Sequence, residues 1–290
     1  MRAHNSKKNN FNPKKIERHI DYIEKKTDEY LTQLDEFDKV EQAEKISDVK
    51  EKINRLKDNQ IKYEALGDIM EDKNATQIST TDPDSRALLV QGQVVEVSYN
   101  VQTAVDEKHK LIVATHTINR NDRNAMSGIA KEAKVNLNAE KFTVLLDKGY
   151  HNGRELEECK KQNIATICAH AEIVNSNDKG TTPDYLVTKF IYNKEEDTYT
   201  CPQEQTLRTT GTWHKKTRER DSYNFKKYRT PACKECPVKH LSTGRAQGGR
   251  ELDRSEFADA VEENNKRYHE NTSLYRKRQE LERSGTHEDK

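Results

Sequence analysis

The sequence predicts an α/β fold with helical segments before and after a modest core. Between residues 93 and 169, segments rich in Val, Ile and Thr alternate with short amphipathic segments, which is the order of strands and helices in an α/β core. Residues 14–66 contain neither Gly nor Pro and repeat their apolar side chains at helical spacing. Hydrophobic residues make up 32% of the chain and charged residues 35%, which favours one modest core with polar appendages.

Residues 1–76 are predicted to form an antiparallel helical hairpin with a coiled-coil-like seam. Two blocks of apolar residues follow alternating steps of four and three, and the stretch from Glu36 to Ala43 interrupts their register. The blocks are Ile16, Ile20, Ile23, Thr27, Tyr30 and Leu34, then Ile46, Val49, Ile53 and Leu56. Self-association as a dimeric coiled coil is the alternative. An internal hairpin is favoured because each block is only two or three heptads long.

Residues 77–174 are predicted to form the α/β core, after a turn at Thr80 to Arg86. The expected elements are strand 93–105, strand 111–118, a helix capped by Asp122 that runs to about Val135, strand 142–146, helix 154–162 and strand 165–169. A linker begins at residue 175, and helix returns after residue 250. The predicted domains are therefore 1–76, 77–174, a basic Cys-rich insertion at 175–250 and a C-terminal helix at 251–290.

Charge and cysteine content limit the protein classes that fit. The net charge is +1, so the whole chain shows no basic bias, but residues 201–250 hold twelve Lys or Arg against four Asp or Glu. That surplus suits a polyanion such as DNA, and a solvated basic loop is the alternative. Five cysteines, an odd number, and the absence of an apolar leader or spanning stretch predict a cytoplasmic protein without a membrane partner.

Three cysteines have spacing that suits zinc. Cys233 and Cys236 form a Cys-x2-Cys pair, and Cys201 offers a third thiolate across the intervening segment. His240 or His214 would complete four ligands, and the alternative is a set of reduced thiols in a loop. Two further cysteines are expected to be packing residues, namely Cys159 on a helix and Cys168 on a strand.

Asp147 is the strongest candidate site residue. It directly follows the predicted strand 142–146 and precedes a turn with Gly149 and Gly153. Ligands of open α/β sheets bind at the carboxyl ends of strands, where a carboxylate can contribute to a metal site. The alternative interpretation is a structural aspartate that caps the following helix.

Eight segments, in order along nearly the whole chain, form a recognisable series. They are Thr81-Asp-Pro-Asp-Ser-Arg86, Tyr99-Asn-Val-Gln-Thr-Ala-Val-Asp106, Leu111-Ile-Val-Ala114, Asn121-Asp-Arg-Asn124, Asp147-Lys-Gly-Tyr-His-Asn-Gly153, Tyr199-Thr-Cys-Pro202, Cys233-x2-Cys236-Pro and Tyr275-Arg-Lys-Arg-Gln-Glu280. Together they resemble a bacterial insertion-sequence transposase of the DDE type. The resemblance implies an RNase H-like core in which carboxylates hold two Mg²⁺ or Mn²⁺ ions for DNA cleavage and strand transfer at transposon ends.

The resemblance assigns expected roles to particular residues. Asp147 matches the second aspartate of the family, and Glu282 matches the catalytic glutamate in the spacing Tyr-x2-Arg-x3-Glu, with Glu280 as its rival. Lys148, Arg276 and Arg278 are expected to hold the DNA backbone. Ser242 stands where the family usually has a further cysteine, which weakens the zinc interpretation.

The sequence also departs from the family pattern at both ends. The first aspartate of the family and its strand are expected before residue 1, and residues 283–290 do not continue the family's final helix. We therefore expect an incomplete RNase H-like core, truncated at both ends, and an inactive copy of the enzyme. A non-catalytic DNA-binding protein or a coiled-coil interaction protein is the alternative.

Overall fold

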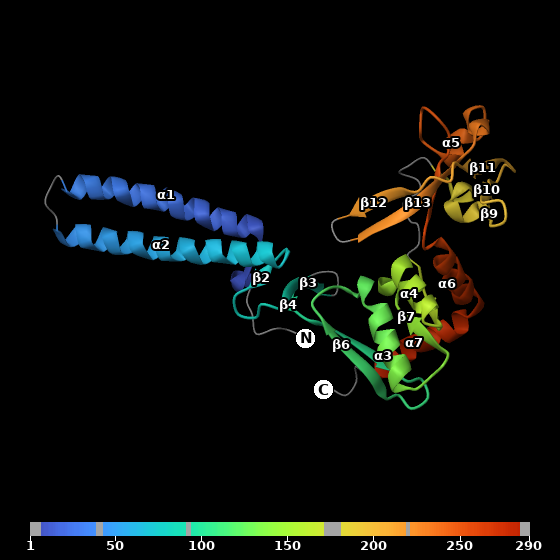
Figure 1. Ribbon diagram of the computed structural model, residues 1–290, viewed down its shortest axis with the longest axis horizontal. Coiled ribbons are helices and arrows are strands. Elements are labelled where there is room, and N and C mark those ends of the chain that lie inside the picture. The colour runs from blue at the N-terminus through green and yellow to red at the C-terminus, as the bar shows by residue number, and fades with distance from the viewer. Residues whose placement is uncertain (1–6, 39–42, 91–93, 171–180, 219–220, 285–290) are drawn as a thin grey trace. The chain divides into compact units, whose positions relative to one another are not determined.

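The computed structural model describes residues 7–38, 43–90, 94–170, 181–218 and 221–284 (Figure 1). The fold is mixed α/β, with seven α-helices and several small sheets among these residues. The chain divides into two compact units, Met1–Thr103 with Thr115–Asp122, and Ala104–Ala114 with Arg123–Lys290. Each unit is described by itself. The four-domain division and the RNase H-like core stay predictions.

Two long helices dominate the first unit. Helix α1 (Pro13–Asp38) and helix α2 (Ala43–Asp72) lie side by side along their length (Figure 1). Their predicted seam residues Ile16, Ile23, Val49 and Ile53 are buried, as the helical spacing requires. At the open end of the pair, a hydrophobic cluster of Phe11, Ile16, Met70 and Ile78 fixes the two helices together.

The strands of the first unit form short antiparallel pairs. Strand β1 (Asn10–Phe11) pairs with β2 (Ile78–Ser79), and β3 (Arg86–Val90) pairs with β4 (Val94–Ser98). Strand β5 (Asn100–Val105) pairs with β6 (Ile112–Ile118), and each of these two strands has residues in both units.

The predicted single strand over residues 93–105 is wrong, because the chain leaves one ladder at Ser98 and enters another at Asn100. Tyr99 stands at this break, and its hydroxyl donates a 2.7 Å hydrogen bond to Asp82 Oδ1. The alternation of Val, Tyr and Thr was continuous across a position where the pairing partner changes. A sequence pattern records strand propensity but not which partner each segment takes.

The predicted helix cap at Asp122 is also wrong. Asp122 lies in a short 3-10 turn (Asp122–Asn124), and helix α3 (Met126–Asn136) begins four residues later, with Ala125 at its N-cap. The Asp122 carboxylate instead accepts hydrogen bonds from Asn100 Nδ2 at 2.7 Å and Gln102 Nε2 at 2.8 Å. These contacts bind the start of β5, and they compete with the capping role.

The second unit contains a two-stranded parallel sheet that positions the candidate site. Strand β7 (Phe142–Leu146) pairs in parallel with β8 (Ile164–Cys168), and α4 (Gly153–Lys161) forms the crossover between them. Strand–helix–strand at this position was predicted, with boundaries that differ by one residue. The core under the sheet buries Met126 of α3, Leu156 and Cys159 of α4, and Ala260 of α6 (Ala258–Glu270).

A six-stranded antiparallel sheet follows in the same unit. Its order is β12, β13, β11, β10, β9, with β14 paired to β13. Tyr199, Leu207, Tyr228 and Leu252 form its core with Phe190. The strands are β9 (Ile191–Asn193), β10 (Thr198–Thr200), β11 (Thr206–Thr209), β12 (His214–Arg218), β13 (Asp221–Arg229) and β14 (Leu252–Ser255).

The prediction of a helix directly after residue 250 is therefore wrong for residues 252–255. Leu252 pairs with Tyr228 and is buried, so β14 completes the sheet before the chain becomes helical at Ala258. The second unit also contains α5 (Lys239–Ser242) and α7 (Thr272–Ser284). Short 3-10 turns lie at Lys7–Asn9, Lys148–Tyr150, Pro183–Tyr185, Val187–Lys189 and Pro231–Lys234.

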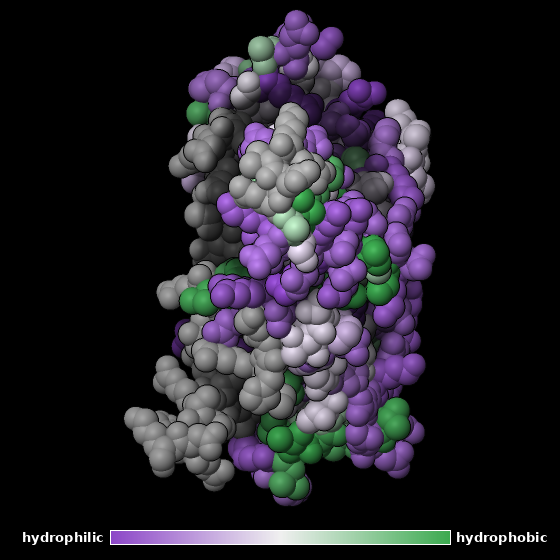
Figure 2. Space-filling view, turned by 90° about the vertical axis from the view of Figure 1, so that its left-hand side faces the viewer, coloured by the Kyte–Doolittle hydropathy of each residue, from purple (hydrophilic) through white to green (hydrophobic). Residues whose placement is uncertain are grey.

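The chain is strongly hydrophilic. Mean hydropathy is −1.14, and hydrophilic residues predominate on the face shown in Figure 2. Within the described ranges, every helix is too short or too polar to cross a membrane.

Candidate functional site at the carboxyl ends of β7 and β8

Asp147 begins the turn that follows β7. Its backbone is extended, and its Oδ1 accepts a 2.6 Å hydrogen bond from the Lys148 N–H, so it caps the 3-10 turn Lys148–Tyr150. The side chain is nevertheless 54% exposed. Capping occupies one direction of the carboxylate, and the exposure leaves room for another ligand. The structural and the ligand-binding interpretations of this residue are therefore compatible.

Helix α7 places a cation beside this carboxylate. Arg278 Nη2 lies 3.7 Å from Asp147 Oδ1, and the Arg278 side chain is only 13% exposed. The guanidinium also lies over the Tyr275 ring, 5.2 Å from its centroid, and Tyr275 meets Tyr268 edge-on at 4.9 Å. Burial raises the pKa of Tyr275. Two residues named from the sequence, Asp147 and Arg278, are thus brought together by an aromatic contact between α6 and α7.

A buried amide fixes the end of β8 to α6. Asn264 is completely buried; its Oδ1 accepts from the Cys168 N–H at 3.0 Å, and its Nδ2 donates to the Cys168 carbonyl at 2.8 Å. The Cys168 thiol in turn donates to the Asp147 carbonyl at 3.2 Å, and burial raises the pKa of this thiol to about 12. Cys168 is therefore a packing thiol, as predicted, and it links the ends of both strands.

Three histidines lie at the same edge. The rings of His151 and His170 are 6.3 Å apart, and those of His170 and His269 are 6.1 Å apart. Burial lowers the pKa of His151, and a hydrogen bond from its ring to Asn265 only partly opposes this, so the imidazole is neutral near pH 7. Only His151 lies inside a sequence motif. The other two come from separate segments, and nothing in their local sequence indicated this cluster.

The other predicted site residues are placed less tightly. Lys148 lies in the turn after β7 and Arg276 lies on α7, and both are exposed to solvent. Glu280 and Glu282 lie on the α7 backbone, but their side chains fall outside the described part of the chain. The choice between these two glutamates stays open.

The carboxyl edge offers one described carboxylate, Asp147, as a possible metal ligand. A hard cation such as Mg²⁺ prefers several oxygen ligands, and Asp147 could donate one. Among the residues that the structure describes, no three or more His, Cys, Asp or Glu side chains are grouped to hold one metal ion. The Mg²⁺ or Mn²⁺ prediction stays a prediction.

The three candidate zinc cysteines are free and partly buried. Cys201 Sγ accepts hydrogen bonds from the backbone N–H groups of Gln203 and Gln205, both at 3.3 Å. Cys233 packs so closely on Gly249 that a Cβ at residue 249 would lie 2.2 Å from the Cys233 Cβ. Cys201, Cys233 and Cys236 do not form a ligand group in the described ranges, and zinc binding stays a prediction.

A buried arginine, Arg254, stabilises the six-stranded sheet. Arg254, which is 7% exposed, pairs with Asp259 at 2.6 Å and with Glu262, donates to the Tyr199 hydroxyl, and stacks on Tyr192 at 3.6 Å. These partners satisfy the guanidinium. This network is structural, because its polar atoms are used within the fold.

Comparison of the chain with models of known protein families, with characterised proteins and with solved structures found no match.

Proposed function

We propose that this chain is a DNA-binding protein of the DDE transposase lineage, with Asp147 as a metal-binding carboxylate and with little strand-transfer activity. The proposal joins the sequence resemblance to one structural observation. Asp147 is half exposed at the carboxyl end of a parallel strand, and α7 packs beside it. This is the position at which α/β proteins bind their ligands.

The cations around Asp147 suit a phosphate backbone. Arg278 is held against Asp147 by Tyr275, while Lys148 and Arg276 extend into solvent on neighbouring elements. Cations in this arrangement contact phosphate oxygens without reading base sequence. The role proposed for Lys148 and Arg276 is therefore to hold DNA, and the role proposed for Arg278 is to orient Asp147.

The described residues fit a divalent cation only in part. A bound Mg²⁺ or Mn²⁺ would stabilise charge on the entering and leaving oxygens of a phosphodiester. Asp147 offers it one oxygen, and Glu282 or Glu280 is proposed as a further ligand. The Arg278 guanidinium repels a divalent cation at that carboxylate, so cation binding is expected to be weak. Weak cation binding is the physical reason for proposing little strand transfer.

A strand-transfer assay tests both parts of the proposal. Full-length protein is incubated with end-labelled duplex DNA and target plasmid in Mg²⁺ or Mn²⁺, and binding is measured separately by gel shift. We expect binding with joining near background, and any residual joining lost in Asp147→Asn. Asp253→Asn is the matched control, since Asp253 is exposed on β14 and changes the charge equally. Failure to bind DNA would overturn the proposed DNA-binding function, and robust joining abolished by Asp147→Asn would overturn the proposal of little strand-transfer activity.

An interaction protein is the second candidate, and the helical pair supports it. Helices α1 and α2 bury their seams against each other, yet Tyr22, Leu31 and Ile61 remain 57%, 48% and 63% exposed. Exposed apolar residues on long helices suit self-association. Sedimentation velocity separates the possibilities, because a concentration-dependent dimer lost in Leu31→Glu would favour this function, while a monomer at all concentrations would argue against it.

A further inference from the structure

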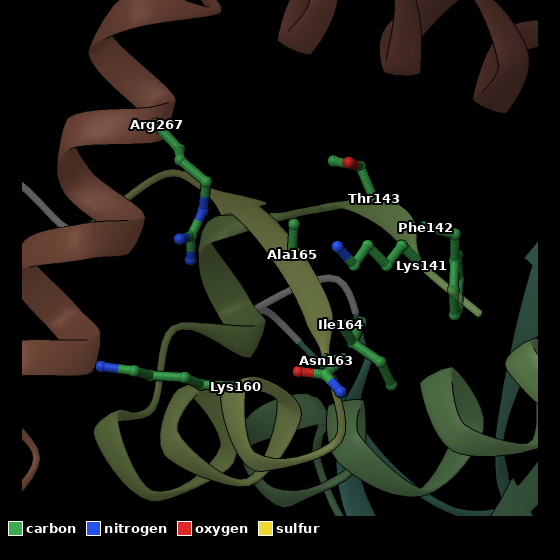
Figure 3. Close-up of a pocket in the computed structure, with 8 residues that line it drawn as sticks. All are labelled: Lys141, Phe142, Thr143, Lys160, Asn163, Ile164, Ala165 and Arg267. Atoms are coloured by element: carbon green, nitrogen blue, oxygen red, sulfur yellow. The ribbon is translucent and has the colours of Figure 1, made fainter.

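A basic pocket lies at the amino ends of β7 and β8, away from Asp147. Its volume is about 350 Å³, and it is lined by the polar residues Lys141, Thr143, Lys160, Asn163 and Arg267 and by Phe142, Ile164 and Ala165 (Figure 3). Lys160 comes from α4 and Arg267 from α6, while Lys141 and Asn163 come from the loops that precede β7 and β8. Convergence of separate elements on one space is the usual origin of a ligand site.

The cations of the pocket are only partly neutralised. Lys160 Nζ pairs with Glu263 Oε1 at 2.5 Å, and Figure 3 shows its ammonium turned toward α6. Arg267 Nη1 lies 3.8 Å from the same glutamate. The Glu263 carboxylate thus pairs with both Lys160 and Arg267, and Lys141 adds a third positive charge. The lining itself contains no acidic residue.

Arg267 is held in place by neutral acceptors. Its Nε donates to the Thr166 carbonyl at 2.9 Å, and its Nη2 donates to Thr166 Oγ1 at 3.3 Å. These bonds fix the guanidinium without cancelling its charge. A fixed, planar guanidinium is well suited to phosphate oxygens, because little side-chain entropy is lost on binding.

Lys141 is available for a ligand. Among the described residues it forms no hydrogen bond or ion pair, and it is exposed at the start of β7. In Figure 3 the ends of Lys141 and Arg267 point toward one another across Ala165. Ala165 is small, so the space between the two charged groups stays open. The Asn163 amide offers further donors at the lower edge of the pocket.

We propose that this pocket binds the phosphate group of a phosphate ester. Lys141, Arg267 and the Asn163 amide supply N–H donors from several directions, and Lys160 adds a positive charge beside them, which suits a tetrahedral anion better than a planar carboxylate. The five residues of β7 separate the pocket from Asp147 by roughly 15 Å. Phosphate binding here is thus independent of the proposed metal chemistry, and goes beyond it. The ester is either a free small molecule or the backbone of a nucleic acid.

Calorimetric titration of the full chain with pyrophosphate, in buffer containing EDTA, tests the proposal. The variants are Lys141→Ala, Lys141→Arg as a conservative change, and Arg267→Gln. The matched control is Lys161→Ala, because Lys161 is exposed on α4 beside Lys160 but does not line the pocket. A melting curve of each variant checks that it folds, and Lys141→Ala removes no hydrogen bond or ion pair among the described residues.

We expect pyrophosphate to bind wild type, Lys161→Ala and Asp147→Asn equally, and Lys141→Ala about tenfold more weakly, with recovery in Lys141→Arg. Competition with labelled duplex DNA shows whether the bound phosphate belongs to a nucleic-acid backbone or to a free small molecule. Displacement of the duplex by pyrophosphate supports a backbone phosphate, and binding without displacement supports a free phosphate ester. No binding of pyrophosphate, or equal losses in Lys141→Ala and Lys161→Ala, would overturn the proposal. The titration is run in EDTA and does not depend on a metal ion at Asp147. A negative strand-transfer assay would therefore leave the pyrophosphate result unaffected.

Discussion

Removing the positive charge of Arg278 is expected to strengthen cation binding at Asp147. Arg278 Nη2 and Asp147 Oδ1 are 3.7 Å apart. Two unit charges at about 4 Å interact by roughly 1 kcal/mol in water and roughly 4 kcal/mol at an effective dielectric constant of 20. Since Asp147 is half exposed, the value in water applies. The Arg278 guanidinium repels a bound divalent cation about twice as strongly as a single charge, at a slightly greater distance. The expected gain for Arg278→Gln is about 1–2 kcal/mol, or roughly tenfold in Kd.

Electron paramagnetic resonance of free Mn²⁺ measures this affinity directly. Wild type should bind Mn²⁺ weakly, Arg278→Gln about tenfold more tightly, and the double variant with Asp147→Asn no better than wild type. Arg276→Gln is the matched control, because it lies on the same helix, is exposed and removes the same charge. Equal affinities in Arg278→Gln and Arg276→Gln, or tight binding that survives Asp147→Asn, would refute this reasoning.

Three further predictions concern stability. Asn264→Ala leaves the buried N–H and carbonyl of Cys168 without partners and should lower the free energy of unfolding by about 2–4 kcal/mol in urea titrations; a loss below 0.5 kcal/mol, on the order of an exposed substitution, would contradict the role of this amide. Hydrogen bonds and the charge of Lys226 outweigh burial and lower the pKa of Asp197 to about 2 from 3.8, so its contribution is fully present above pH 3.8 and lost as pH falls toward 2. Because Asp197 is a third exposed, that contribution is about 1 kcal/mol after screening, and Asp197→Asn should flatten this part of the stability curve; an unchanged curve counts against the assignment. Gly249→Ala places a Cβ 2.2 Å from the Cys233 Cβ and should cost about 1–3 kcal/mol in calorimetry, whereas a neutral result would show that this loop moves freely.

The parts of the fold that the sequence predicted well are those encoded by neighbouring residues. Phe142–Leu146, Gly153–Lys161 and Ile164–Cys168 were identified because a short apolar strand, a glycine turn and an amphipathic helix each have a local pattern. The buried seam of α1 and α2 was predicted for the same reason. Burial of Cys159 and Cys168 is likewise confirmed.

The failures occur where a distant segment decides the outcome. Asp122 was expected to cap a helix, but side chains of β5, about twenty residues earlier, take its carboxylate. Leu252 looked like part of a helical region, but β13 recruits it into a sheet. Local propensity could not have shown either competitor, because both depend on tertiary pairing.

In the candidate site, too, residues with a local sequence signal were predicted and residues that act through distant contacts were not. Asp147 was found from its position after a strand, and Arg278 from a resemblance that spans distant parts of the chain. Asn264 and Arg267 were missed, since each acts on β8 across about one hundred residues and lies in a helix with no distinguishing motif. The basic pocket was missed for the same reason.

Photo-crosslinking with DNA tests the central claim most directly. Full-length protein is irradiated with a duplex that carries 4-thiothymidine, and the crosslinked peptides are identified by mass spectrometry. The account predicts that the chain binds the duplex and that crosslinks form within residues 147–151 and on α7, the segments around Asp147 and Arg278. Binding with crosslinks confined to other segments, or no binding at all, would contradict it.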